Sequence, residues 1–458
     1  MKEKIISYAS YLLSLLLVIN FIYNQLNNFK FSKLNQFDLL AGVLLFFLLF
    51  NIGKAIKQAL HLSSISFSIV MYLFSFFVFD IIILFIYQQL SFKNIFLFVN
   101  LLWFLFFLLF KQEFKITTFV LINYLILNIF SSRYASLFSV NNNLVGDVDA
   151  VFFDQAKNIY ENSYFISVNN FIMEGYPQFV SYIQALFLQL PNFTSEYSFY
   201  SFTSHLIYYL TILFFLELNI SKNNKIILVA LFTSLIGNSD WLQFLFTTSL
   251  MSEGVVSLFT AVLIVNLFEV KLSSKIVNSL SFFNLGLLYL SKQFNSTIAL
   301  IIIISFLFIN RGSITVFFGF FGFIINELAY LIIFPNISKE HHIRQIDLQD
   351  MIFDLMLFRD LKFENILLIF KNLWIDKPYV LIIIVFYLTF INAYLKTNQL
   401  SLQQGTIFLI VNLNFIMIFA LYISAWQNME LESPIRYMLN MLHLTLVSIA
   451  IGFEKIKR

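Results

Sequence analysis

The chain has 458 residues, of which 60% are hydrophobic and 12% are charged, with a formal net charge of +3. A soluble domain carries about a quarter charged residues, so this composition excludes an ordinary soluble enzyme and indicates a membrane protein. The sequence has no cysteine, which excludes disulfide bonds and thiol catalysis.

Apolar runs of about 17 to 25 residues predict an all-α polytopic membrane protein with roughly 12–14 transmembrane helices. The first run lacks a small-residue cleavage site, so it is interpreted as a spanning helix rather than a signal peptide. In chain order, we expect spanning helices at 5–23, 38–53, 62–88, 94–110, 115–131, 200–218, 225–237, 253–270, 276–291, 296–310, 314–334, 379–395, 404–424 and 436–453.

Lys and Arg in the short loops predict the orientation of these helices. They gather in alternate loops, for example at Lys54, Lys57, Lys222 and Lys396, which predicts that both termini are cytoplasmic. Two long segments then lie outside the membrane. The chain therefore divides into N-terminal helices, a first outer loop, central helices, a second outer loop and C-terminal helices, at 1–131, 132–199, 200–334, 335–378 and 379–458.

The first outer loop contains the polar stretch GDVDAVFFDQAKNIYENSYF, which begins at Gly146. Its apolar residues follow helical spacing, and Asp147, Asp154 and Glu161 recur every seven residues on another face, which predicts an amphipathic helix. Its acids could cap the helix N-terminus or lie on a solvated face. Alternatively, one of them could be a general base at the membrane surface.

This stretch resembles the first extracytoplasmic loop of GT-C-fold glycosyltransferases, of the protein mannosyltransferase and aminoarabinose transferase type. Asp149, Ala150, Phe152 and Ala156 match that loop's second acid, small residue, aromatic residue and alanine. The family's first acid, its usual base candidate, falls on Val148, which is a departure from the pattern.

The resemblance therefore implies that Asp149 or Asp147 acts as the general base. Asp154 is expected to support the site or to lie on a solvated face. Four further segments, which begin with EGYPQF, SEGVVS, LSKQFN and SPIRYM, follow in the family's order. The resemblance assigns supporting or binding roles in these segments to Glu174, Tyr176, Glu253, Lys292, Arg436 and Tyr437.

A lipid-linked sugar carries a phosphate or diphosphate, which basic side chains would bind. Lys292, Arg436 and Arg344 are the candidates on the outer side. The alternative is that these side chains reach the lipid headgroups and fix helix ends.

No metal site is predicted, because the adjacent His341 and His342 lack a metal-binding spacing. Some members of the resembled family use a divalent cation and others do not, so no cofactor is assigned.

Four acids fall inside predicted spans, where carboxylates are costly and often functional. Glu217 and Glu269 lie near the inner ends, where snorkelling toward the headgroups or an error in the predicted topology explains them. Asp80 and Glu327 could pair inside the bundle, as in a proton-coupled transporter.

Together these patterns predict a multi-pass protein of the bacterial inner membrane that transfers a sugar on the extracytoplasmic face. The expected donor is a polyprenyl-phosphate-linked sugar, and the acceptor is an envelope glycan, lipid or protein. The alternatives are an O-antigen or polysaccharide polymerase or ligase and, third, a lipid-linked sugar flippase or transporter. No nucleic-acid partner is expected, because no basic binding patch occurs.

Overall fold

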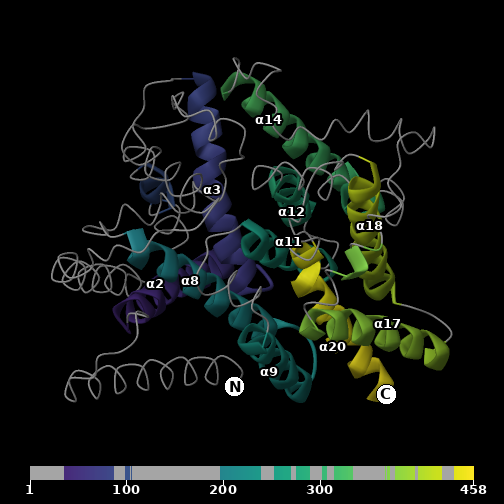
Figure 1. The fold of residues 1–458 in the computed structure, drawn as a ribbon. Helices are drawn as coiled ribbons and strands as arrows, with labels where there is room; N and C mark the ends of the chain where they lie inside the picture. The colour runs from purple at the N-terminus through teal and green to yellow at the C-terminus, as the bar shows by residue number, and fades with distance from the viewer. Residues whose placement is uncertain are drawn as a thin grey trace, which may run out of the picture.

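The computed structural model describes a helical bundle (Figure 1). The described residues are 36–86, 98–103, 105, 196–238, 252–269, 275–288, 302–306, 314–333, 367, 369–371, 377–397, 401–424 and 438–457. Within these ranges no strand occurs, which confirms the all-α prediction. The named elements are α2 (Gln36–Leu60), α3 (Ile65–Ile86), α8 (Glu196–Glu217), α9 (Lys222–Asn238), α11 (Ser252–Glu269), α12 (Lys275–Leu287), η5 (Ile314–Val316), α14 (Phe317–Ile333), α17 (Lys377–Thr397), α18 (Leu402–Ser424), η7 (Leu439–Met441) and α20 (Leu442–Lys457).

These helices coincide with predicted apolar runs, and most of their ends lie within four residues of the predicted ones. Two differences stand out. The run predicted to end at residue 53 continues as α2 to Leu60, because the following segment is rich in Ala, Lys and Gln, which are good helix formers. The run predicted at 436–453 contains the 3₁₀ turn η7 before α20 begins. The predicted helices at 5–23 and 115–131 lie outside the described residues.

Fewer of the described helices are long and apolar enough to cross a membrane than the sequence predicts. In the described part of the chain, Leu402–Ala420 of α18 is the one helix long and apolar enough to cross a membrane by itself. Leu49–Leu60 and Ile65–Phe76 pass the same test only as a pair, and they are bent by 98°. Shorter apolar helices occur within α8, α11, α17 and η7–α20. The predicted 12–14 crossings therefore remain a prediction.

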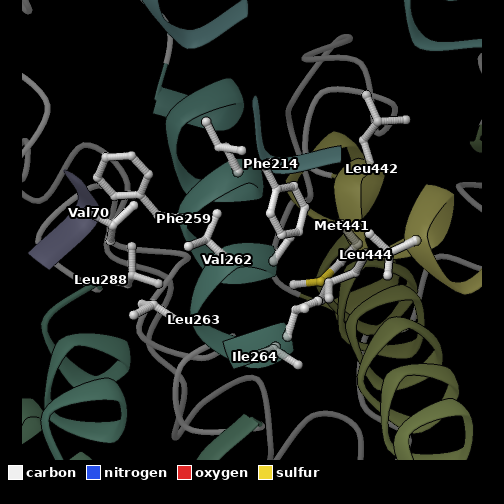
Figure 2. Packing of buried hydrophobic residues seen from close by; sticks show 14 of the residues in the cluster. Val70, Phe214, Phe259, Val262, Leu263, Ile264, Leu288, Met441, Leu442 and Leu444 are labelled. Carbon is white, nitrogen blue, oxygen red and sulfur yellow. The ribbon is translucent and has the colours of Figure 1, made fainter. Parts of the chain in front are cut away.

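Helix α11 is the central element of the bundle. Every residue from Gly254 to Asn266 is buried. Figure 2 shows α11 between Val70 and Leu288 on one side and Met441 on the other. The other helices pack most extensively in pairs: α12 with α14, α17 with α20, and α2 with both α3 and α8.

Glycines allow α12 and α14 to approach closely. A Cβ atom on Gly286 of α12 would collide with the carbonyl oxygen of Gly319 and would lie 2.7 Å from the backbone nitrogen of Phe323. A Cβ atom on Gly322 of α14 would collide with the carbonyl oxygen of Phe283. The two backbones are therefore in contact, as at the small-residue interfaces of membrane helices.

We expect Gly322→Ala to destabilise the protein, because its methyl group meets backbone that cannot rotate away. The expected loss is about 1–3 kcal/mol in the free energy of unfolding, measured by denaturation of the detergent-solubilised protein. Gly405→Ala is the matched control, because nothing lies within 4 Å of the added Cβ atom. That variant should be neutral or slightly stabilised, and equal losses in both variants would contradict the close contact.

Candidate functional site

The site residues that the sequence predicts fall almost entirely outside the described part of the chain. Glu253 is the second residue of α11, at the head of that helix as expected, although its side chain is not described. The remaining predicted site residues lie outside the described residues: Asp147, Asp149, Asp154, Glu174, Tyr176, Lys292, Arg344, Arg436 and Tyr437. The described part contains two other polar clusters, one at the helix ends and one inside the bundle.

The first cluster centres on the N-terminus of α3. The backbone N–H groups of Ile65 and Ser66 donate to the two carboxylate oxygens of Glu217, at 2.6 and 2.8 Å. The next N–H group, of Phe67, donates to the hydroxyl of Ser64 at 3.2 Å. A helix N-terminus leaves its first N–H groups without partners and favours negative charge nearby. Glu217 of α8 therefore caps α3 from a different helix.

The chain turns sharply just before this cap. Leu62 donates its N–H to the carbonyl of Lys57 at 3.0 Å, which closes the end of α2. The intervening His61 has a φ of 52°, the left-handed conformation usual at such helix ends. This turn is the 98° bend between the apolar stretches of α2 and α3. Glu217 therefore caps the second helix of this bent pair.

A chain of hydrogen bonds extends from this turn to α11 and α12. The Ser63 hydroxyl donates to Oδ1 of Asn266 at 2.6 Å, and Nδ2 of Asn266 donates to the Ser281 hydroxyl at 3.2 Å. Ser281 in turn donates to the carbonyl of Val277. These hydrogen bonds therefore link the C-terminal end of α11 and the middle of α12 to the α2–α3 turn.

A second carboxylate caps α9 in the same manner. Glu454 of α20 accepts the N–H of Ser221 at 3.0 Å and Nδ2 of Asn224 at 2.8 Å. Lys225 donates from Nζ to the carbonyl of Leu216 at 2.6 Å, which links α9 back to α8.

These contacts connect one end each of α3, α8, α9, α11 and α20 and reach Ser281 in the middle of α12, and we call them the helix-end network. The basic residues of the short loops predict all five of these ends on the cytoplasmic side. The network brings the five ends together, and the alternation of helix directions across a membrane stays a prediction. Its two carboxylates accept hydrogen bonds from helix N-termini, so they are structural groups here. The sequence analysis explained Glu217 by snorkelling or by an error in the predicted topology; the structure shows instead that its carboxylate binds the start of α3.

The second cluster, which we call the His443 pin, joins three helices inside the bundle. Nδ1 of His443 lies 2.8 Å from the Ser257 hydroxyl, and Nε2 lies 2.9 Å from the Thr211 hydroxyl. The backbone N–H of His443 also donates to Ser257, at 3.1 Å. All three residues have no exposed surface.

The hydrogen bonds assign the imidazole tautomer. Thr211 donates its one hydroxyl hydrogen to the carbonyl of Ile207 at 2.9 Å, so its oxygen accepts the proton on Nε2 of His443. Nδ1 is then the acceptor for the Ser257 hydroxyl. The sequence shows hydroxyl and imidazole groups within otherwise apolar runs, but it does not show that these groups meet.

A serine hydrogen-bonded to a histidine has the composition of an activated nucleophile. Here the far side of the imidazole meets a threonine in place of the acid of a catalytic triad. The Phe215 and Phe232 rings lie 6.0 and 5.5 Å from the imidazole, between centroids. The cluster is thus suited to joining α8, α11 and α20, and not to hydrolysis of a substrate.

Other buried amides keep unused hydrogen-bonding capacity. Asn414 of α18 and Asn440 of η7 are almost fully buried, and neither atom of either amide has a hydrogen-bond partner among the described residues. Among the described residues, no group of three or more His, Asp or Glu side chains could hold a metal ion. Asp80 and Glu327 lie on α3 and α14, with side chains outside the described residues, so their pairing remains a prediction.

Comparisons with known proteins add no relative. No protein-family model, no curated protein and no solved structure matches the chain.

We expect Glu217→Ala to destabilise the protein by about 2–3 kcal/mol, because two backbone N–H groups at the start of α3 lose their acceptor. Glu217→Gln should lose less, since its amide oxygen can still accept one of them. The free energy of unfolding in detergent measures both. Asn223→Ala is the control, an exposed residue in the first turn of α9. An alanine variant at position 217 as stable as this control would contradict the capping role.

The His443 pin predicts an order of effects. Ser257→Ala removes the partner of both the backbone N–H and Nδ1 of His443, with an expected loss of about 2–4 kcal/mol. Thr211→Val removes the partner of Nε2 alone and should cost less, about 1–2 kcal/mol. Thr445→Val is the control, because Thr445 donates to the carbonyl of Met441, one turn earlier in the chain, and not to another part of the bundle. Unfolding measurements that reverse this order would refute the assigned contacts.

Proposed function

We propose that the protein is an integral membrane glycosyltransferase that moves a sugar from a polyprenyl-phosphate donor to an envelope glycan, lipid or protein acceptor. The observation that carries this proposal is the order of the family-like segments along residues 146–453. Two helix positions support it. Glu253 lies at the head of α11, and Arg436 lies three residues before η7 begins.

In the proposed reaction, Asp149 or Asp147 takes the proton of an acceptor hydroxyl. The resulting oxygen attacks the anomeric carbon, and the bond from that carbon to the phosphate oxygen breaks. The polyprenyl phosphate leaves with the electron pair, and its negative charge is balanced by Lys292, Arg436 and Arg344. Attack opposite the leaving group inverts the anomeric carbon.

The proposed location is the bacterial inner membrane, with the chemistry on the extracytoplasmic face. Three features support a membrane environment: the hydropathy of the chain, the candidate span Leu402–Ala420 and the glycine contact between α12 and α14. The helix-end network supports helices that alternate in direction, since it gathers the ends that the basic loops predict on one side.

A second candidate is a lipid-linked sugar flippase or transporter. Taken as one interrupted span, the pair Leu49–Leu60 and Ile65–Phe76, bent by 98°, favours it, because interrupted helices are frequent in transporters. A flippase would leave the bond between sugar and phosphate intact, so product analysis separates it from a transferase. A polysaccharide polymerase or ligase would also form a glycosidic bond, and it would use a lipid-diphosphate-linked oligosaccharide as donor.

The proposal is tested with membranes that contain the protein and a radiolabelled polyprenyl-phosphate sugar. We expect Asp149→Asn or Asp147→Asn to lower the rate of transfer by about 10²-fold or more, since a general base contributes that much. Glu161→Gln is the matched control on the same predicted helix and should retain most of the rate. Equal protein levels in the membrane establish that the variants insert normally.

If both variants at positions 147 and 149 transfer at the wild-type rate, these aspartates are helix caps and the proposed mechanism is wrong. If the wild-type protein releases no sugar but moves the intact donor across the membrane, the flippase function replaces the transferase.

A further inference from the structure

Helix α17 has two faces of opposite character. Leu381, Ile384, Leu388, Ile391 and Leu395 form one stripe with helical spacing, which we call the α17 stripe. Their exposed fractions lie between 47% and 68%, although all are large aliphatic side chains. From 379 to 395 the helix contains no Asp, Glu, Lys or Arg.

The opposite face of α17 packs against the bundle. Ile382, Phe386 and Ala393 on this face are buried. Tyr379 donates its hydroxyl to the carbonyl of Met438 at 2.9 Å. Thr389 meets Gly452 of α20, where a Cβ atom would lie 2.7 Å from the threonine methyl group. The stripe is therefore the outer side of a helix whose inner side is fixed.

Helix α17 also contacts α18, the next helix of the chain, through a few large side chains. The rings of Phe390 and Phe408 stack with centroids 3.6 Å apart, and Tyr387 donates to Oδ1 of Asn412 at 2.7 Å. Since α18 is long and apolar enough to cross a membrane, these contacts place α17 beside a candidate span.

Buried polar side chains accompany the exposed aliphatic ones on both helices. On α17, Thr389 is buried, although Asn392 beside the stripe is exposed. On α18, Gln404, Thr406 and Asn414 are buried, whereas Leu402 and Ile416 are about as exposed as the α17 stripe. A contiguous exposed aliphatic face of this kind is uncommon on a protein surrounded by water. Helix α17 has 21 residues, which gives a length of about 31 Å, close to the hydrocarbon thickness of a bilayer of about 30 Å.

We propose that the α17 stripe faces the acyl chains of the bilayer. This inference rests on the membrane location under the proposed function but not on the transferase activity. The side chains of the stripe favour lipid over a second protein. Where helices of this chain touch closely, glycines lie at the contact, as at Gly322 and Gly452. The stripe has only Leu and Ile, without the small residues that membrane helix contacts use.

The absence of cysteine makes a direct test straightforward, because single cysteines can be spin-labelled without background. Labels at Ile384→Cys and Leu388→Cys report on the stripe in protein reconstituted into phosphatidylcholine and phosphatidylglycerol vesicles. Labels at Ile382→Cys and Ala393→Cys are matched buried controls on the same helix. A label at Ile416→Cys on α18 is the membrane reference. Collision rates with oxygen, which concentrates in lipid, and with a water-soluble nickel chelate are then measured.

On the stripe, we expect oxygen collisions several-fold more frequent than at the buried positions, with few nickel collisions. Frequent nickel collisions on the stripe, with a lipid-like reference at 416, would overturn the inference and place the stripe in water. Few collisions of both kinds on the stripe would overturn it in favour of a protein partner. Frequent nickel collisions at 416 as well would remove the membrane location itself. Transfer assays on the same vesicles report on the proposed function separately.

Discussion

The fold depends on the capping of α3 by Glu217. After the chain turns at His61, the N-terminus of α3 has N–H groups with no partner inside their own helix. The carboxylate of Glu217 accepts two of them and carries the charge that this helix end favours. Because Glu217 is the last residue of α8, one side chain fixes the end of α8 against the start of α3. The bonds from Ser63 to α11 and α12 extend the same joint across the bundle.

Between α17 and α18 and at the His443 pin, polar side chains form hydrogen bonds between helices within a large apolar core. Hydrophobic burial distinguishes little between helices when the surroundings are also apolar, so hydrogen bonds and close contacts must select the partners. The His443 pin and the glycine contact of α12 with α14 supply these two kinds of interaction. The proposed chemistry would occur at loops held by this frame, outside the described residues.

The sequence predicted the helices well because long apolar runs dominate it. Both ends of α11 lie within one residue of the predicted ends, and the C-terminal end of α18 is the predicted one. The end of α2 was missed because helix propensity continues beyond the apolar run. The roles of Glu217 and His443 could not be predicted, since each depends on a partner more than 150 residues away. A hydropathy pattern records which residues avoid water, but not which residues meet.

The His443 pin also has a consequence for the order of synthesis. Ser257 precedes His443 by 186 residues, and Thr211 precedes it by 232. When α8 and α11 have left the ribosome, their hydroxyls still lack the imidazole that joins them. Helix α20 thus closes the bundle, because it supplies the imidazole that joins α8 to α11. Until α20 is made, the side chains of these two earlier helices lack the partner that links them.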